Sequence, residues 1–444
     1  MLMFCFPFKS KKQNTPAQQP LLPVRVVITG RDENAAVGLK KVLADSFQSM
    51  PFLSVVFEDD FAPEDFLNPD NKNFFDFFDT GIKALKKHNA DVLLRFFQNG
   101  TQVRFNFLTQ NMYLASASPF FSSLFGLYLP ISYFQSQDLP VQICCLISAT
   151  FVALSLKKDS RYTEILKELV NILSKNKMPQ GIEKSFMPHI LNLLAFNYLA
   201  LHADSFQKKD ITLISNLINS ANKIKAKPDD LLTEGALLTL AAQMYACAAE
   251  AKNADSYTFY ERAVEKAKKA LKYFNKYVFP YDYGRLCIVL SKFYFSFFKL
   301  SENRQSLRDA VFYMREAEKI FTRASTPSLW ADIQGDLGAY LARLSFYSKN
   351  KEIAEIAVQN YKNKQSFYQK ETYPLLWAQT EKSIADIYYY LGKDSENAAY
   401  LEKASDTYWN ALEILEECGD TEHVQMIDNV LKKIDENFLR LNKK

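Results

Sequence analysis

The chain has 444 residues, of which 48% are apolar and 23% charged, so it is long enough for two or three folded domains and unlike a disordered polymer. Its net charge of +4 gives no general attraction to nucleic acid or to anionic membranes. The six cysteines include no CxxC pair and the four histidines have no ligand spacing, so we expect a reducing compartment and no metal site.

Residues 1–22 read as a disordered apolar-basic tail and linker. Three phenylalanines precede three lysines, and a segment rich in Gln and Pro follows. A secretory signal has the opposite order, with charge before a longer apolar core, so export is not predicted. Contact of this tail with a membrane surface is the less favoured alternative.

Residues 23–115 predict a small α/β domain. Strands are expected at 24–29 and 53–57, helices at 33–47 and 75–88, and a hairpin of 92–97 with 102–108 around Asn99-Gly100. This order of strands and helices indicates a small mixed sheet with helices on it.

Two segments of this domain could be considered as binding or catalytic sites. Gly30 follows the first strand, but GRDENAAVG has no phosphate-binding motif, and Asp32 and Glu33 would repel a phosphate. Asp32 or Asn34 as a helix cap is the favoured interpretation. The acidic run 58–60 directly follows a strand and is interpreted as a solvated loop rather than a metal or acid–base site.

Residues 116–255 predict a helical region, and whether its helices are degenerate repeats stays open. The stretch 140–156 is the most apolar in the chain and lies at the lower length limit for crossing a bilayer. It contains Gln142, Ser148 and Thr150, so a buried core helix is favoured over a membrane span. From here to the end, helices are predicted at 118–127, 138–156, 161–175, 184–203, 210–225, 231–251, 256–276, 284–300, 306–324, 330–348, 353–370, 376–392, 398–417 and 421–441.

Residues 256–444 contain a repeat of 47 residues. Three prolines keep this spacing, an aromatic residue follows each after three positions, and four alanines keep the same step. The members are Pro280, Pro327 and Pro374; Tyr283, Trp330 and Trp377; and Ala263, Ala310, Ala357 and Ala404. Self-similarity at this period predicts stacked units, each too small to bury its own apolar face.

The unit resembles an extended tetratricopeptide repeat, a pair of helices called A and B. Helix A of that family carries a large residue beside a small one, and helix B carries small residues around an aromatic. Here these are Leu290-Ser291, Leu337-Gly338 and Ile384-Ala385, then Ala263/Ala267/Ala270, Ala310/Met314/Ala317, Ala357/Tyr361/Lys364 and Ala404/Tyr408/Ala411. The departures are the length, 47 residues against about 34, and Lys364 in place of a small residue. The resemblance implies an α-solenoid, a mainly α fold behind the small α/β domain.

The whole layout resembles a group of bacterial proteins with a short apolar-basic start, a small α/β domain and long repeats. VRVVITG (24–30) stands for the first strand of that group, and TPSLWADIQGDLG (326–338) carries its repeat signature. The resemblance implies an adaptor that is cytoplasmic or peripheral at the inner membrane.

Helix A of such solenoids faces the concave side, so the repeat register predicts a partner-binding face. The residues expected to line it are Arg285, Lys292, Phe295, Asp332, Gln379, Lys382, Asp386 and Tyr389. This set mixes both signs of charge with aromatic rings, which suits a protein or peptide segment better than nucleic acid.

No catalytic motif or cofactor motif is found in the sequence, so we expect a non-enzymatic adaptor or scaffold. One alternative is a structural protein that self-associates or sits on a membrane complex, for which the aromatic content of 14% and the apolar-basic start are the motivation. A further alternative is an enzyme whose site is formed by scattered residues of the α/β domain.

Overall fold

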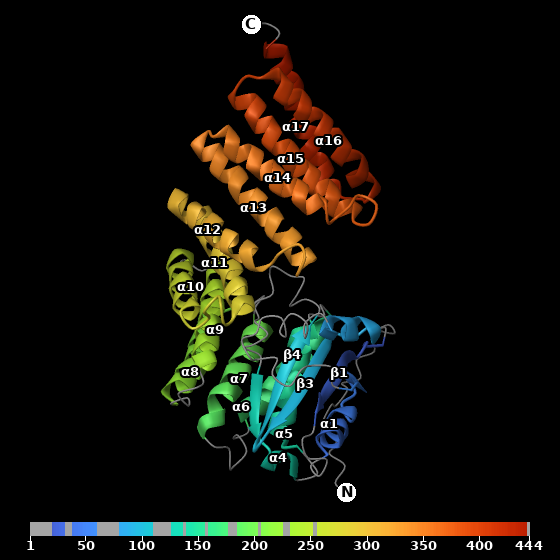
Figure 1. Ribbon diagram of the computed structural model, residues 1–444, viewed down its shortest axis with the longest axis vertical. Coiled ribbons are helices and arrows are strands. Elements are labelled where there is room, and N and C mark those ends of the chain that lie inside the picture. Colours follow the sequence, from blue (N-terminus) through green and yellow to red (C-terminus); the bar gives the residue numbers. More distant parts are fainter. Residues whose placement is uncertain are drawn as a thin grey trace, which may run out of the picture.

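A computed structural model describes residues 20–31, 38–59, 80–109, 126–135, 139–155, 159–175, 184–202, 206–224, 231–251 and 255–441. A small sheet domain lies at one end and a stack of helical hairpins extends from it (Figure 1). The predicted fold class, a mainly α solenoid preceded by a small α/β domain, is confirmed.

The N-terminal domain is built on a five-stranded mixed sheet. The strands are β1 (Val24–Arg31), β2 (Leu53–Phe57), β3 (Val92–Asn99), β4 (Gln102–Thr109) and β5 (Gly126–Pro130), in the order β2-β1-β3-β4-β5. β1 is parallel to β2 and β3, whereas β3–β4 and β4–β5 are antiparallel. The predicted mixed sheet is therefore confirmed.

β5 corrects two predictions. The expected helix at 118–127 is wrong for its last two residues, which begin β5, and its other residues lie outside the described ranges. Leu127 and Leu129 are both fully buried, so the apolar positions alternate as they do in a strand. Because Leu129 pairs with Val103, the sheet domain extends beyond the predicted boundary at residue 115.

Two glycines set local boundaries in this domain. Gly38 has a left-handed backbone (φ 58°), so α1 (Leu39–Gln48) begins after it, and residues 33–37 of the predicted helix lie outside the described ranges. The proposed caps at Asp32 and Asn34, and the acidic Asp60, lie outside the described residues. In the β3–β4 hairpin Asn99 pairs with Gln102, which leaves Gly100 (φ 56°) as the first residue of the two-residue turn.

From residue 139 onward the described helices follow the predicted order, with boundaries shifted by a few residues, whereas the short helix at 132–135 is not among the predicted ones. The helices from residue 132 onward are α4 (Ser132–Gln135), α5 (Val141–Ser155), α6 (Ser160–Lys175), η2 (Lys184–Phe186), α7 (Met187–His202), α8 (Lys208–Lys223), α9 (Leu231–Glu250), α10 (Ser256–Leu271), α11 (Pro280–Ser301), α12 (Arg304–Ile320), α13 (Pro327–Ser348), α14 (Lys351–Gln365), α15 (Pro374–Asp394), α16 (Ala398–Glu417) and α17 (Thr421–Leu441). A further helical segment covers 80–87, inside the predicted 75–88.

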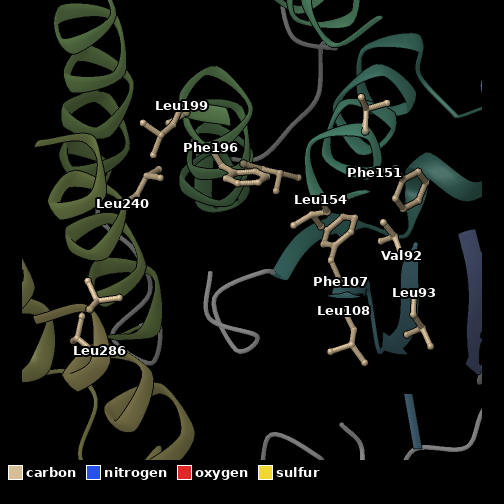
Figure 2. Packing of buried hydrophobic residues seen from close by; sticks show 14 of the residues in the cluster. Val92, Leu93, Phe107, Leu108, Phe151, Leu154, Phe196, Leu199, Leu240 and Leu286 are labelled. Carbon is tan, nitrogen blue, oxygen red and sulfur yellow. The ribbon is translucent and has the colours of Figure 1, made fainter. Parts of the chain in front are cut away.

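α5 joins the sheet to the solenoid. The Phe151 ring packs against Phe107 of β4 at 6.0 Å and against Phe47 of α1 at 5.5 Å, between centroids. Figure 2 shows Phe151 and Leu154 of α5 beside Phe107, and Leu199 of α7 facing Leu240 of α9. The prediction that this apolar stretch is a buried core helix is confirmed. Among the described helices, none combines the length and the hydropathy that crossing a membrane requires.

The 47-residue repeat is a stack of three hairpins: α11 with α12, α13 with α14, and α15 with α16. We call the first helix of each hairpin the A helix and the second the B helix. Each A helix begins at the repeat proline itself, because the first helical position needs no backbone N–H. The four repeat alanines are fully buried. A methyl group on Gly338 would come within 2.9 Å of the Tyr361 ring, so the small residues permit the close approach of A and B helices.

A further series with the same period forms the turn between A and B helices. Glu302, Lys349 and Glu396 have left-handed backbones with φ of 50–51°. The asparagine after each is the N-cap of the next helix, and its side chain accepts a backbone N–H at 2.8–2.9 Å. These caps are Asn303, Asn350 and Asn397. The repeat thus specifies its turns as well as its packing.

The three caps provide a test of this equivalence. We expect Asn303→Ala, Asn350→Ala and Asn397→Ala each to lower the free energy of unfolding by about 1 kcal/mol, because one backbone N–H loses its acceptor. The measurement is urea denaturation followed by circular dichroism. Asn350→Asp keeps an acceptor oxygen and is the matched control. Equal stability of the Ala and Asp variants would contradict the capping role.

Candidate functional site

The eight residues predicted for partner binding all lie on A helices. Arg285, Lys292 and Phe295 are on α11, Asp332 is on α13, and Gln379, Lys382, Asp386 and Tyr389 are on α15. All except Arg285 are half-buried. Their side chains are therefore partly accessible from one side of the stack.

Arg285 differs from the expectation. Only 1% of its surface is exposed, and it shares the buried first turn of α11 with Tyr281 and Asp282. The register makes position 285 equivalent to Asp332 and Gln379, but unlike those two residues Arg285 is almost fully buried. The structure thus places Arg285 in the core of the stack and not on a surface that contacts a partner.

A cavity of about 370 Å³ opens between the A helices α13 and α15. We call it the α13–α15 pocket, and its lining is Asp332, Gly335, Asp336, Tyr361, Lys364, Gln379, Thr380, Lys382, Ser383 and His423. It brings together three of the predicted residues, Asp332, Gln379 and Lys382. The other predicted residues lie outside the lining.

Two carboxylates one helical turn apart form the α13 wall of the pocket. Burial raises the pKa of Asp332 to about 6, although the Tyr368 hydroxyl donates to its Oδ1 at 3.0 Å. Burial also raises the pKa of Asp336, whose buried Oδ2 has no hydrogen-bond partner among the described residues. Both carboxylates therefore lie in a site that water solvates poorly.

Two lysines face these carboxylates from neighbouring helices. Lys292 of α11 and Lys364 of α14 act on Asp332 and Asp336 by Coulombic attraction, without a hydrogen bond to either. Burial lowers the pKa of Lys292, which shows that this charge is desolvated too. The cluster thus contains two carboxylates and two lysines, but neither carboxylate is hydrogen-bonded to a lysine.

The α15 wall is fixed by its own contacts. Lys382 Nζ lies 2.8 Å from Asp386 Oδ2, and the Tyr408 hydroxyl donates to Asp386 Oδ1 at 2.5 Å. Near the other end of the pocket, Gln379 donates to Asp420 at 3.0 Å, and His423 Nδ1 lies 2.8 Å from the same carboxylate oxygen. The lysine and the histidine on this wall therefore already have anionic partners.

Lys364 enters the pocket because of a paired change within the repeat. Its long side chain lies along Gly335, where a methyl group would come within 2.8 Å of the Lys364 Cδ atom. The equivalent pairs in the neighbouring units have a large residue on the A helix and a small one on the B helix. These pairs are Ile288 with Ala317, and Lys382 with Ala411. In the central unit this arrangement is reversed, with the small residue Gly335 on the A helix and the large residue Lys364 on the B helix.

The predicted aromatic residues take part in the stack itself. Phe295 packs on Tyr340 of α13 with ring centroids 4.4 Å apart, and Lys299 Nζ lies over the Phe295 ring, 5.5 Å from its centroid. Tyr389 is half-buried on α15. Neither ring lines the α13–α15 pocket. Phe295 lies on α11, and Tyr389 lies on α15 beyond the α15 residues of the lining.

The sequence analysis did not select several residues of the pocket, among them Asp336, Gly335, Ser383 and His423. Asp336 lies four positions after Asp332 and so falls on the same helical face, which is a signal that the sequence contains. Lys364 stands where the repeat has small residues, and Gly335 is its complement. His423 belongs to α17, outside the 47-residue register, so the repeat pattern does not point to it.

The two described residues of the acidic run after β2, Glu58 and Asp59, lie at the surface. Glu58 forms ion pairs with Lys87 and His88, and the Lys87 hydrogen bond lowers its pKa. Asp59 is exposed. Within the described ranges, no group of three or more His, Cys, Asp or Glu side chains is arranged to hold a metal ion.

Comparisons with known proteins assign no family to the chain. Neither the family models nor the curated proteins gave a match. A solved structure described as a circular tandem repeat protein with novel repeat topology and enhanced subunit contact surfaces is similar at a TM-score of 0.24 and 13% identity, over 70% of this chain and 85% of that one. The architecture described above therefore rests on the structure of the chain itself.

The raised pKa of Asp332 has a consequence for stability. Between about pH 3.8 and about pH 6 the Asp332 carboxyl is protonated in the folded chain and ionised in the unfolded chain. This group therefore lowers the free energy of unfolding as pH rises through that range. We expect Asp332→Asn to stabilise the protein by about 1 kcal/mol more at pH 7.5 than at pH 5. Urea denaturation of variant and wild type at both pH values measures this difference.

The control for this prediction is Asp420, whose pKa is lowered by the hydrogen bond with His423. Asp420→Asn should show no such difference between pH 5 and pH 7.5, because a carboxyl with a lowered pKa is ionised in both the folded and the unfolded chain over that range. Asp336, Lys292, Lys364 and Tyr368 face Asp332, so the difference reports the whole cluster. A change in stability that is the same at both pH values would contradict the desolvation of Asp332.

Gly335 and Lys364 should be energetically coupled. Gly335→Ile alone collides with the lysine, and Lys364→Ala alone leaves its space empty, so we expect each to lower the free energy of unfolding by about 1–3 kcal/mol. The double variant has the same large–small pairing as Ile288 with Ala317. Its loss in the free energy of unfolding should be at least about 1 kcal/mol smaller than the sum of the losses in the two single variants. Urea denaturation of the four proteins gives the coupling, and additivity within about 0.5 kcal/mol would disprove it.

Proposed function

We propose that the protein is a non-catalytic adaptor or scaffold, without a cofactor, that binds a protein or peptide segment along its A helices. The observation that carries the proposal is the row of half-buried polar and aromatic side chains on α11, α13 and α15, at whose centre lies the α13–α15 pocket. Stacked hairpins present such continuous surfaces, and charged groups of both signs among aromatic rings suit a polypeptide.

We further infer that the hairpins are an extended form of the tetratricopeptide repeat. The fully buried alanines and the contact of Gly338 with Tyr361 support this, because the family uses small residues where A and B helices meet. On the same resemblance we propose a bacterial origin and a cytoplasmic location, with a peripheral position at the inner membrane as the variant that the apolar-basic start would allow.

Site-specific photo-crosslinking in the native cell tests the proposal. A benzoylphenylalanine at Phe295 or Tyr389 places the probe on the A helices, and one at Phe312 or Trp409, which are 57% and 58% exposed, places it on B helices. We expect a discrete crosslinked protein from the A-helix positions only. Lys292→Ala combined with Lys382→Ala should reduce that product at least about fivefold, since two cationic contacts are removed.

Two outcomes would contradict the proposal. Equal crosslinking from both sets of positions would mean that the A helices are not a selective surface. Products that contain only copies of this chain would instead support the alternative of a self-associating structural protein, which the exposed Phe312 and Trp409 favour as a contact surface.

A further inference from the structure

The α13–α15 pocket contains two charged groups of opposite sign that the fold leaves without close partners. Asp336 Oδ2 is buried and accepts no hydrogen bond from the described residues. Lys364 attracts both Asp332 and Asp336 but is hydrogen-bonded to neither. By contrast, Lys382 has Asp386 and His423 has Asp420. A buried polar group normally has a partner, because leaving it without one is costly.

The charge balance of the cluster restricts what can supply these partners. Asp332 and Asp336 are balanced by Lys292 and Lys364, so a lone anion or a lone cation would leave one charge in excess in a poorly solvated site. A molecule that carries a cationic donor and an anionic acceptor close together satisfies both groups and leaves the net charge unchanged.

The size and lining of the pocket narrow the class further. A cavity of about 370 Å³ is at the small end of ligand pockets, which span roughly 300–1,000 Å³. Thr380, Ser383 and Gln379 add hydroxyl and amide groups to the charged lining, so a polar ligand fits better than an apolar one. The reversal of the large–small pair places Gly335 and Lys364 in the lining on the side of the central unit, and α15 supplies residues of the opposite wall.

We propose that the α13–α15 pocket binds a free α-amino acid, with the ammonium group on Asp336 and Asp332 and the carboxylate on Lys364. This site goes beyond the proposed binding of a polypeptide, because it needs no protein partner. The ligand occupies the centre of the A-helix surface, so its presence changes the charge and shape that a bound segment meets.

Isothermal titration calorimetry on the purified full chain at pH 7.5 tests the proposal. The probes are the twenty free amino acids, their N-acetyl derivatives, their primary amides, sodium acetate, methylammonium chloride and the capped dipeptide acetyl-Lys-Glu-amide. We expect at least one free amino acid to bind. Its N-acetyl and amide forms should bind at least about tenfold more weakly, because each loses one charge-assisted contact.

Variants locate the site. Asp336→Asn keeps the shape and removes a desolvated charge, so we expect it to fold and to bind about tenfold more weakly. Lys364→Gln should do the same, and Gly335→Ile with Lys364→Ala should abolish binding because it fills the pocket. Asp428→Asn, an exposed change on α17, is the matched control and should bind normally.

Several results would overturn the proposal. These are no binding by any free amino acid, binding of acetate or methylammonium as tight as that of the amino acid, and unchanged affinity in both Asp336→Asn and Lys364→Gln. Binding of the capped dipeptide alone would assign the two charges to side chains of a bound segment and would also reject the free amino acid. The photo-crosslinking probes at Phe295 and Tyr389 lie outside the pocket, whereas Lys382 lines it, so crosslinking of the otherwise unchanged chain, and not of the lysine variants, lets either proposal fail without the other.

Discussion

The close approach of A and B helices is the constraint on which the solenoid depends. Ala263, Ala310, Ala357 and Ala404 are fully buried, and side chains any larger would force the paired helices apart. The same spacing recurs in the proline that begins each A helix and in the asparagine that begins each B helix. One unit therefore fixes packing distance, helix start and turn together, and stacking the units buries the remaining apolar faces.

The sheet domain and the first hairpins of the solenoid share one core, so they stabilise each other. This buried cluster runs from the strands through α5 and α7 to Leu286 of α11 (Figure 2) and onward to Ile387 of α15, and a second cluster lies within α15, α16 and α17. α5 lies at the junction, since it packs on β1 and β3 on one side and on α6 and α7 on the other. This double role explains why the most apolar stretch of the chain is a core helix, with nearly all of its residues buried.

The sequence predicts the repeat well and the site only in part, for a physical reason. Period and small residues follow from contacts within one hairpin, so Pro327 and Ala357 are visible in the sequence. Arg285 shares that register, yet it is buried, because burial depends on tertiary packing that the repeat pattern does not encode. β5 was missed because its pairing partner is distant in sequence, and His423 because it comes from a helix outside the period.

The pocket lies where the repeat departs from its usual pairing of a large A-helix residue with a small B-helix residue. The units on either side pair a large A-helix residue with a small B-helix residue, Ile288 with Ala317 and Lys382 with Ala411. At Gly335 and Lys364 the pairing is reversed, so the lysine amine, instead of a second apolar side chain, lies beside Asp332 and Asp336. The cost of desolvating these charges appears in the raised pKa of both carboxyls. The Gly335–Lys364 pair opposes stability, and its two members on α13 and α14 are complementary in size. A role in binding explains this pair better than a role in packing, because an Ile–Ala pair at the same two positions would stabilise the hairpin.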